Sequence, residues 1–212
     1  MSTSGRHRDP AGRDWQVLLF GGASGVGKTS VSYRLAQHFG VGLTEVDDFQ
    51  IVLERMTDPD RYPVFHFWRL HTEEALRMGE AEQVDFFVRY AAAMEEALLP
   101  VIGNHLETRT PMIFEGDFIL PSLATHERYG DEAANGQVRA VFLYEPDEAQ
   151  IARNYLARDG EEQPQRARTS FLVSERLRCE AERLDVRTVP ARPWETVLER
   201  VIAAVGPHCY DR

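Results

Sequence analysis

The chain has 212 residues, of which 43% are hydrophobic, and a formal net charge of −10. This length suits one compact domain with a full hydrophobic core. The acidic balance argues against nucleic acid or an anionic membrane as the main partner. No apolar stretch approaches the roughly 20 residues that a membrane-spanning helix needs. We therefore expect a soluble protein with neither a membrane nor a nucleic-acid partner.

The two cysteines, Cys179 and Cys209, lack the close spacing of zinc or redox motifs. Unpaired thiols are typical of a reducing compartment, which favours the cytoplasm. Residues 1–14 are polar and contain several arginines. We expect a disordered start over 1–14, followed by a single domain over 15–212. The oligomeric state stays open.

Apolar runs bounded by turn residues predict strands, and apolar residues at a 3.6-residue period predict helices. Gly79 and Pro100 are expected to break or kink a long helix, and an irregular insertion is expected after the second strand. Alternating strands and helices indicate an α/β fold with a mainly parallel five-stranded sheet and helices on both faces. In chain order we expect strands at 15–20, 43–46, 111–114, 138–144 and 188–189, helices at 30–39, 49–56, 72–106, 146–158, 166–184 and 194–205, and the insertion at 57–70.

The segment Gly22-Ala-Ser-Gly-Val-Gly-Lys-Thr29 matches the pattern G-x-x-x-x-G-K-[ST] between a predicted strand and a predicted helix. In such a phosphate-binding loop (P-loop), backbone N–H groups and the start of the helix surround the phosphates. Lys28 is expected to reach the β- and γ-phosphates, and the Thr29 hydroxyl to bind Mg²⁺. The motif predicts a P-loop NTPase fold whose nucleotide site consists of Gly22, Ala23, Ser24, Gly25, Val26, Gly27, Lys28, Thr29 and Ser30.

Lys28 is also the one lysine of a chain that contains 23 arginines. An arginine fork is wide and planar, whereas an ammonium is compact, so the pattern indicates a site that admits only the compact charge. A GTPase would need a second lysine to read guanine through an N-K-x-D segment. ATP is therefore the expected nucleotide.

Acidic residues follow two of the predicted strands. Phosphoryl transfer needs Mg²⁺ held in place and an acceptor hydroxyl oriented as it loses its proton. Asp47 follows the second strand and would face the phosphates, while Asp48 is expected to cap the next helix and border the substrate. Glu115 and Asp117 end the third strand, and one of them is expected to hold Mg²⁺ through water. Helix capping and turn formation are the structural alternatives for these carboxylates.

Arginines surround the charged turn 159–165, where we expect a lid over the nucleotide. Of Arg153, Arg158, Arg166 and Arg168, the first two are the leading candidates for a catalytic contact with the transferred phosphate. Pairing with neighbouring acidic residues is the structural alternative.

The insertion also contains basic residues. Arg55 and Arg69 are expected to bind substrate, because a guanidinium matches a carboxylate or phosphate in shape and charge. Neutralisation by nearby acidic residues is the alternative. His66 and His71 are expected to pack within the insertion rather than bind metal.

Taken together, these segments resemble the small P-loop kinases, and within them the 2-phosphoglycerate kinases and related AAA-type ATPases. The resemblance rests on the P-loop, on Val46-Asp-Asp-Phe49 and on Ile113-Phe-Glu-Gly-Asp-Phe-Ile-Leu-Pro121. It implies that Asp47 is the catalytic base, as in similar uridine and chloramphenicol phosphotransferases. Phe118 stands where the phosphoglycerate kinases have histidine, and Gln50 where they have arginine.

We therefore predict an ATP-dependent, Mg²⁺-requiring kinase that phosphorylates a hydroxyl of a small molecule. The arginines of the insertion favour an anionic acceptor, of which a phosphoglycerate is one instance. An antibiotic-modifying or toxin-like phosphotransferase is one alternative, and a switch that binds ATP without transferring phosphate is the other.

Overall fold

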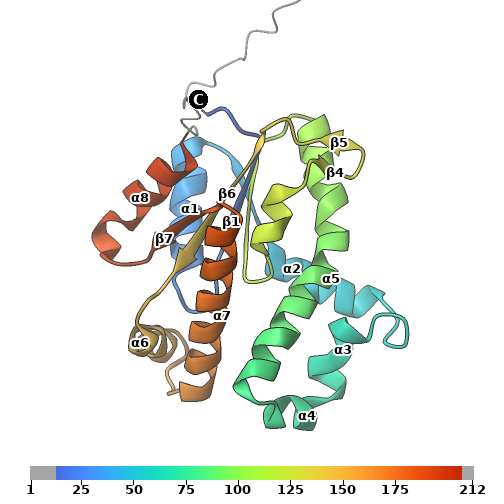
Figure 1. Ribbon diagram of the computed structural model, residues 1–212, viewed down its shortest axis with the longest axis vertical. Coiled ribbons are helices and arrows are strands. Elements are labelled where there is room, and N and C mark those ends of the chain that lie inside the picture. Colours follow the sequence, from blue (N-terminus) through green and yellow to red (C-terminus); the bar gives the residue numbers. More distant parts are fainter. Residues whose placement is uncertain (1–12, 207–212) are drawn as a thin grey trace, which may run out of the picture.

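The computed structural model describes residues 13–206, and its centre is a sheet of five parallel strands (Figure 1). The strand order is β2-β3-β1-β6-β7, so β1 lies in the middle, and all five of its residues are buried. The predicted parallel sheet is confirmed. Its strands are β1 (Val17–Gly21), β2 (Gly42–Glu45), β3 (Met112–Gly116), β6 (Val138–Tyr144) and β7 (Arg187–Pro190).

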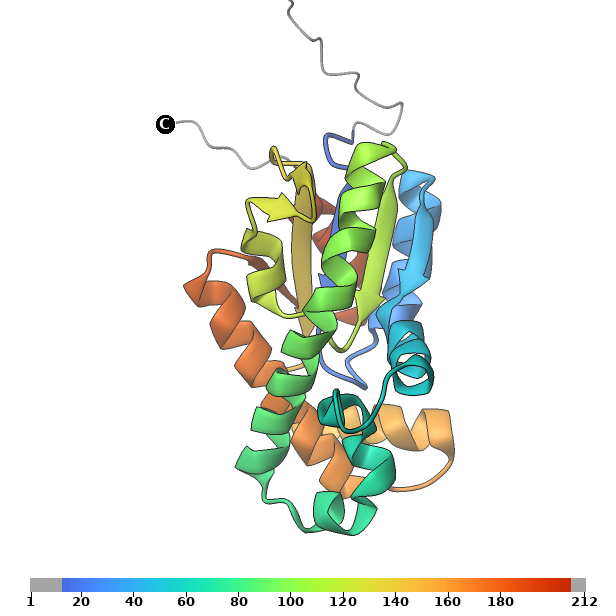
Figure 2. The same cartoon turned by 90° about the vertical axis from the view of Figure 1, so that its right-hand side faces the viewer.

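Helices cover both faces of this sheet, as the strand and helix alternation predicts. α1 (Lys28–Phe39) and α8 (Val197–Val205) contact each other on one face, and α5 (Glu80–Glu107) and α7 (Pro164–Arg183) contact each other on the opposite face (Figure 2). The remaining helices, α2 (Val46–Met56), α3 (Pro63–Leu70), α4 (Thr72–Arg77) and α6 (Glu148–Asp159), lie beyond the carboxyl ends of the strands, in the lower half of both views. They enclose the region where ligands bind in open α/β sheets.

The insertion after β2 differs from the sequence-based expectation. The stretch 57–70 was expected to be irregular, but Pro63 opens α3, because its fixed φ angle suits a first helical turn. Phe65 of α3 packs edge-on against Tyr90 of α5, with ring centroids 5.4 Å apart, and Phe67 packs on Phe86 at 4.5 Å. Aromatic contacts with a distant helix therefore stabilise a helix that local sequence signals did not show.

The start of one helix and one expected helix break also depart from the prediction. α2 begins at Val46 with Glu45 as its N-cap, so Asp48 does not cap this helix and lies in its first turn. The expected break at Gly79 is confirmed, because this glycine separates α4 from α5. Pro100 does not break α5, which continues to Glu107.

A two-stranded hairpin, β4 (Arg128–Tyr129) and β5 (Glu132–Ala133), follows a 3₁₀ turn at Pro121–Thr125 and was not predicted. The buried Tyr129 hydroxyl donates a 2.7 Å hydrogen bond to the carbonyl of Leu123. α5 passes close to the hairpin at Gly103, where a Cβ atom would lie 2.4 Å from the Tyr129 carbonyl oxygen. The carboxyl-terminal half of α5 is thereby fixed against the rest of the protein.

At the amino-terminal edge, Asp14 forms a 3.2 Å ion pair with Arg139 of β6, so contacts with the folded part begin within the expected tail. The rest of that tail, residues 1–12, lies outside the described residues, as does Cys209. Cys179 is a free, exposed thiol. No helix within residues 13–206 combines the length and the apolar character needed to cross a bilayer.

Candidate active site

The P-loop connects β1 to α1 in a conformation that requires glycine. Gly22, Gly25 and Gly27 have φ angles of 147°, 79° and 97°, a region that other residues rarely adopt. A Cβ atom on Gly22 would lie 2.3 Å from the Leu143 carbonyl oxygen. No side chain caps the start of α1, so its first N–H groups remain available to an anion. The loop and helix therefore form the phosphate cradle that the motif predicts.

The Lys28 side chain lies inside this cradle and is only 5% exposed. Its Nζ donates to the Ala23 carbonyl oxygen at 2.9 Å and to Asp117 Oδ1 at 2.5 Å, and Glu115 Oε1 lies 4.0 Å away. Burial alone would lower the pKa of Lys28, but the attraction of Asp117 and Glu115 outweighs it and raises the pKa above its ordinary value. The ammonium therefore stays charged.

The carboxylates of Asp47, Glu115 and Asp117 lie at the carboxyl ends of β2 and β3 and line the same cleft. Glu115 pairs in register with Glu45 of β2 and Phe20 of β1, and the backbone N–H of Asp117 donates to Asp47 Oδ1 at 3.4 Å. Burial raises the pKa of Glu115 to about 7 despite the nearby Lys28. Desolvation, followed by repulsion from Asp117, raises the pKa of Asp47 to about 6. Both groups thus titrate near neutral pH.

These parts line one cleft with a volume of about 530 Å³. The P-loop, all three carboxylates and parts of α6 and of the segment after β7 contribute to its wall. The lining residues are Ser24, Gly25, Gly27, Lys28, Thr29, Ser30, Asp47, Glu115, Asp117, Asn154, Tyr155, Ala157, Arg158, Arg192 and Trp194.

The donor set of the cleft suits Mg²⁺, which prefers oxygen ligands and keeps several of its waters. Thr29, Glu115 and Asp117 all line this cleft. Within residues 13–206, no three His, Cys, Asp or Glu side chains converge to form a metal cage by themselves. An ion here would therefore depend on Thr29, on water and on phosphate oxygens as well as on one carboxylate.

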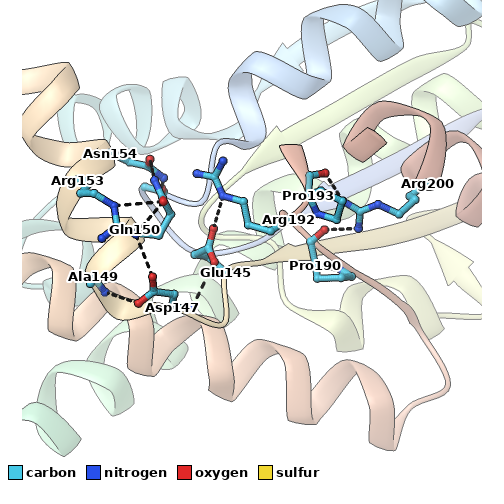
Figure 3. A network of polar contacts seen from close by, with 11 residues as sticks. Glu145, Asp147, Ala149, Gln150, Arg153, Asn154, Pro190, Arg192, Pro193 and Arg200 are labelled. Atoms are coloured by element: carbon cyan, nitrogen blue, oxygen red, sulfur yellow. Dashed lines mark hydrogen bonds and ion pairs between the residues drawn. The ribbon is translucent and has the colours of Figure 1, made fainter. Parts of the chain in front are cut away.

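Arg192 and Trp194, which follow β7, also line the cleft, although no sequence pattern predicted them. The buried Glu145 carboxylate accepts a 3.2 Å hydrogen bond from Arg192 Nε, and Arg200 donates to the carbonyls of Pro190 and Pro193 (Figure 3). The Trp194 ring packs against the P-loop, where a Cβ on Gly27 would lie only 2.7 Å from it.

This placement gives the cleft an aromatic surface beside the phosphate cradle. The Arg192 guanidinium lies 5.6 Å from the Trp194 ring centroid, which adds a cation above that surface. No local sequence motif predicts a role for Arg192 or Trp194. Only their position after the carboxyl end of a strand could have indicated that they lie near the ligand-binding region.

The four lid arginines differ in position. Arg158 lines the cleft, lies 4.9 Å from the Tyr155 ring centroid and pairs with Asp159 at 2.7 Å. Arg153 lies outside the cleft and pairs with Asp147 at 3.0 Å (Figure 3). Arg166 also stacks on Tyr155 and contacts Asp159.

Arg168 bridges α7 to other helices instead of facing the cleft. It contacts Glu80 at 3.3 Å and Glu148 at 2.9 Å. Of the two catalytic candidates, the structure therefore brings Arg158, but not Arg153, to the phosphate cradle.

The expected substrate residues do not line the cleft. Arg69 Nε donates to Glu54 at 2.9 Å, and Arg69 Nη2 lies 3.0 Å from Nδ1 of His66. His66 is buried and its other ring nitrogen lies 3.0 Å from the Thr57 hydroxyl. Arg55 and Asp48 are exposed on α2. A role of Asp48, Arg55 and Arg69 in substrate binding stays a prediction.

A second, smaller cavity of about 140 Å³ adjoins the cleft, and we call it the aromatic cavity. It shares Ser24 and Asp117 with the cleft, and its other walls come from α3, α5, α7 and the segment after β3. Its lining residues are Ser24, Trp68, Phe87, Tyr90, Asp117, Phe118, Thr169, Ser170 and Val173. Because the two cavities share lining residues, two ligands bound in them would lie side by side.

No protein-family model matches the chain. It is similar to curated proteins named 2-phosphoglycerate kinase. The one from Methanococcus vannielii is 29% identical over 115 residues, which are 50% of this chain and 37% of that protein. The one from Methanocaldococcus jannaschii is 27% identical over 114 residues, or 53% of this chain and again 37% of the relative. The similarity therefore spans little more than a third of these relatives.

Solved structures show the same fold. A shikimate kinase from Acinetobacter baumannii, in complex with shikimate, has a TM-score of 0.51 and 13% identity, covering 89% of this chain and 94% of that chain. TT1252 from Thermus thermophilus has a TM-score of 0.51 and 16% identity over the same shares. The fold is that of the small P-loop kinases. The AAA-type ATPases are a different family, so that part of the expected resemblance is corrected.

Replacing Lys28 with arginine tests whether the cradle admits only an ammonium. Contacts of 2.9 Å to Ala23 and 2.5 Å to Asp117 leave little room for a planar fork. We expect the affinity for ATP to fall by about tenfold to a hundredfold, the value of a charge-assisted hydrogen bond. Calorimetric titration measures it, with the exposed exchange Arg34→Lys as the control. Near-normal ATP binding by the Lys28→Arg variant would contradict this explanation.

The raised pKa of Glu115 predicts a pH-dependent stability. Because the folded protein binds this proton up to about pH 7 and an ordinary glutamate releases it near 4.5, the folded state binds more protons between these values. Raising the pH from 4.5 to 7 therefore removes stability, by at most about 3 kcal/mol. Urea unfolding without nucleotide or Mg²⁺ should show this slope in the wild type and a flatter one in Glu115→Gln. The exposed change Glu107→Gln should leave the slope unaltered.

Proposed function

We propose that this protein is an ATP-dependent kinase that transfers the γ-phosphoryl group to a hydroxyl of a small molecule. One observation carries the proposal: Asp47 lies in the same cleft as the P-loop and Lys28, beside a second cavity that shares Asp117 with this cleft. A nucleotide and an acceptor can thus meet at a carboxylate. The kinase fold and the similarity to 2-phosphoglycerate kinases support this reading.

In the proposed transfer, the residues of the cleft have different roles. The P-loop N–H groups and Lys28 would hold the β- and γ-phosphates, and Thr29 with Glu115 or Asp117 would hold Mg²⁺, which neutralises charge on the phosphates when bound. Asp47 would accept the proton of the acceptor hydroxyl as its oxygen bonds to the γ-phosphorus. The bond from that phosphorus to the β,γ-bridging oxygen breaks, and ADP leaves with its electrons.

A switch that binds ATP without transfer is the second candidate, because the P-loop and Lys28 would serve either protein. Asp47 separates the two, since a switch needs no group placed to take a proton from a second ligand. The chemical class of the acceptor is a separate question. An anionic acceptor of the phosphoglycerate kind would depend on Arg55 and Arg69, and neither residue lines either cavity.

Asp47→Asn is expected to retain ATP binding and to lose transfer by about a hundredfold or more, because the amide cannot take the proton. Its matched control is Asp85→Asn, an exposed change on α5 that touches neither cavity. For both variants, transfer is measured as the ADP and the phosphorylated acceptor that the purified protein forms. Equal activity of Asp47→Asn and wild type would exclude Asp47 as the base.

The lid arginines give a second, independent prediction. Arg158→Ala should lower kcat by about a hundredfold with little change in ATP affinity, as expected for a contact that strengthens in the transition state. Arg153→Ala removes the same charge from α6 but only exposed contacts with Asp147 and Gln150, so its kcat should stay near that of the wild type. Steady-state kinetics of the two variants decide, and equal effects would contradict the assignment of Arg158.

A further inference from the structure

The aromatic cavity has a rigid apolar wall. Phe118 stacks on Phe87, with ring centroids 5.4 Å apart, and on Tyr90 at 4.6 Å. Trp68 closes the cavity from α3 and meets Phe86 edge-on at 4.9 Å. Because each ring is held by another ring, the wall would keep its shape when a ligand enters. Such a surface favours the flat or ring-shaped apolar body of a ligand.

The charges around the aromatic cavity disfavour an anion. Among the described residues that line it, Asp117 is the one with a formal charge, and that charge is negative. Lys28, the cation bonded to Asp117, already faces the carboxylates of Asp117, Glu115 and Asp47. An anionic group in this cavity would lose its hydration without gaining a cation and would be repelled by Asp117.

The arginines closest in the chain to these walls are engaged elsewhere. Arg69 pairs with Glu54, and Arg168 pairs with Glu80 and Glu148. Neither arginine lines the cavity. Both guanidinium groups are therefore held in ion pairs, and the exposed Arg89, whose guanidinium lies 5.5 Å from the Phe86 ring centroid, does not line the cavity either.

The polar groups of the cavity are unevenly available. The Thr169 hydroxyl donates to Gln83, and the Ser170 hydroxyl is bonded to the Tyr155 hydroxyl at 2.7 Å. Ser24 and Asp117 lie where the cavity meets the cleft. The Tyr90 hydroxyl is buried, and it has no hydrogen-bond partner within residues 13–206. The cavity therefore has one polar end, at Ser24 and Asp117, on the side of the cleft.

We propose that the acceptor is an uncharged alcohol with an apolar ring-shaped body, which binds in the aromatic cavity with its hydroxyl at Ser24 and Asp117. This inference rests on the proposed kinase function and narrows its substrate class. The ring packs on the aromatic side chains that line the cavity, Phe118, Phe87 and Tyr90. Transfer follows as above, with the proton passing to Asp47.

Two matched pairs of probes test the charge preference by binding alone. Benzyl alcohol is compared with mandelate, and cyclohexylmethanol with hexahydromandelate, so that each pair differs by one carboxylate. Dissociation constants are measured by NMR titration of the full chain with Mg²⁺ and a non-hydrolysable ATP analogue. We expect the neutral member of each pair to bind at least about tenfold more tightly. Equal binding, tighter binding of the acids or of 2-phosphoglycerate, or no binding of the alcohols would overturn the proposal.

Variants locate the binding site. Phe118→Ala should weaken benzyl alcohol binding by about tenfold or more and leave the affinity for the ATP analogue unchanged, which also shows that the variant is folded. Phe118→Leu, which keeps an apolar side chain, should weaken it less. Tyr33→Ala, which removes an exposed ring on α1, is the control. Unchanged binding to Phe118→Ala would place the alcohol elsewhere and overturn the proposal.

Transfer to the bound alcohol is measured separately, as phosphate ester formed from ATP. A probe that binds with the expected preference but accepts no phosphate would count against the kinase activity, while the binding data would still support the preference of the cavity. Failure of the proposed function and failure of this inference thus give different results.

Discussion

The buried ammonium of Lys28 organises the site, because a charge that is nearly removed from water must be matched by the groups around it. It bonds to the P-loop carbonyl of Ala23 and to Asp117, and thereby joins the loop after β1 to the end of β3. Removing one partner of such a buried pair commonly costs about 3–5 kcal/mol. A bound phosphate would have to share Lys28 with Asp117, so nucleotide binding and the position of Asp117 are linked.

That link matters because Asp117 borders both cavities. On one side lies a polar cleft with the phosphate cradle, and on the other a mostly aromatic cavity. The first would hold the strongly charged nucleotide and the second a ligand that gains from leaving water. Asp47 contacts the backbone of Asp117, so the proposed base sits at the boundary between them.

Local patterns predicted most of what depends on short stretches of chain. The P-loop, the parallel sheet and the acidic residues at the strand ends all follow from motif position and hydrophobic period. What escaped prediction depends on contacts between distant segments. Trp194 reaches the nucleotide cleft only because β7 lies beside β6, and α3 forms because its aromatic residues pack on α5. Similarly, Arg153 and Arg158 look alike in the sequence, and only the position of α6 distinguishes them.

The two halves of helix α5 have different roles, one in lining the aromatic cavity and the other in packing against the core and the hairpin. Phe87 and Tyr90, in its amino-terminal half, line the aromatic cavity, whereas Leu98, Ile102 and the close approach at Gly103 belong to the core and the hairpin. At 3.6 residues and about 5.4 Å per turn, the two groups lie at least about two turns apart. Distant sites usually contribute additively to stability. A library that diversifies Phe87 and the exposed positions around it, and keeps Phe86 and Tyr90 on which α3 packs, could therefore alter ligand choice while the contacts that fold the protein stay intact, which makes α5 a natural place to begin directed evolution of this scaffold.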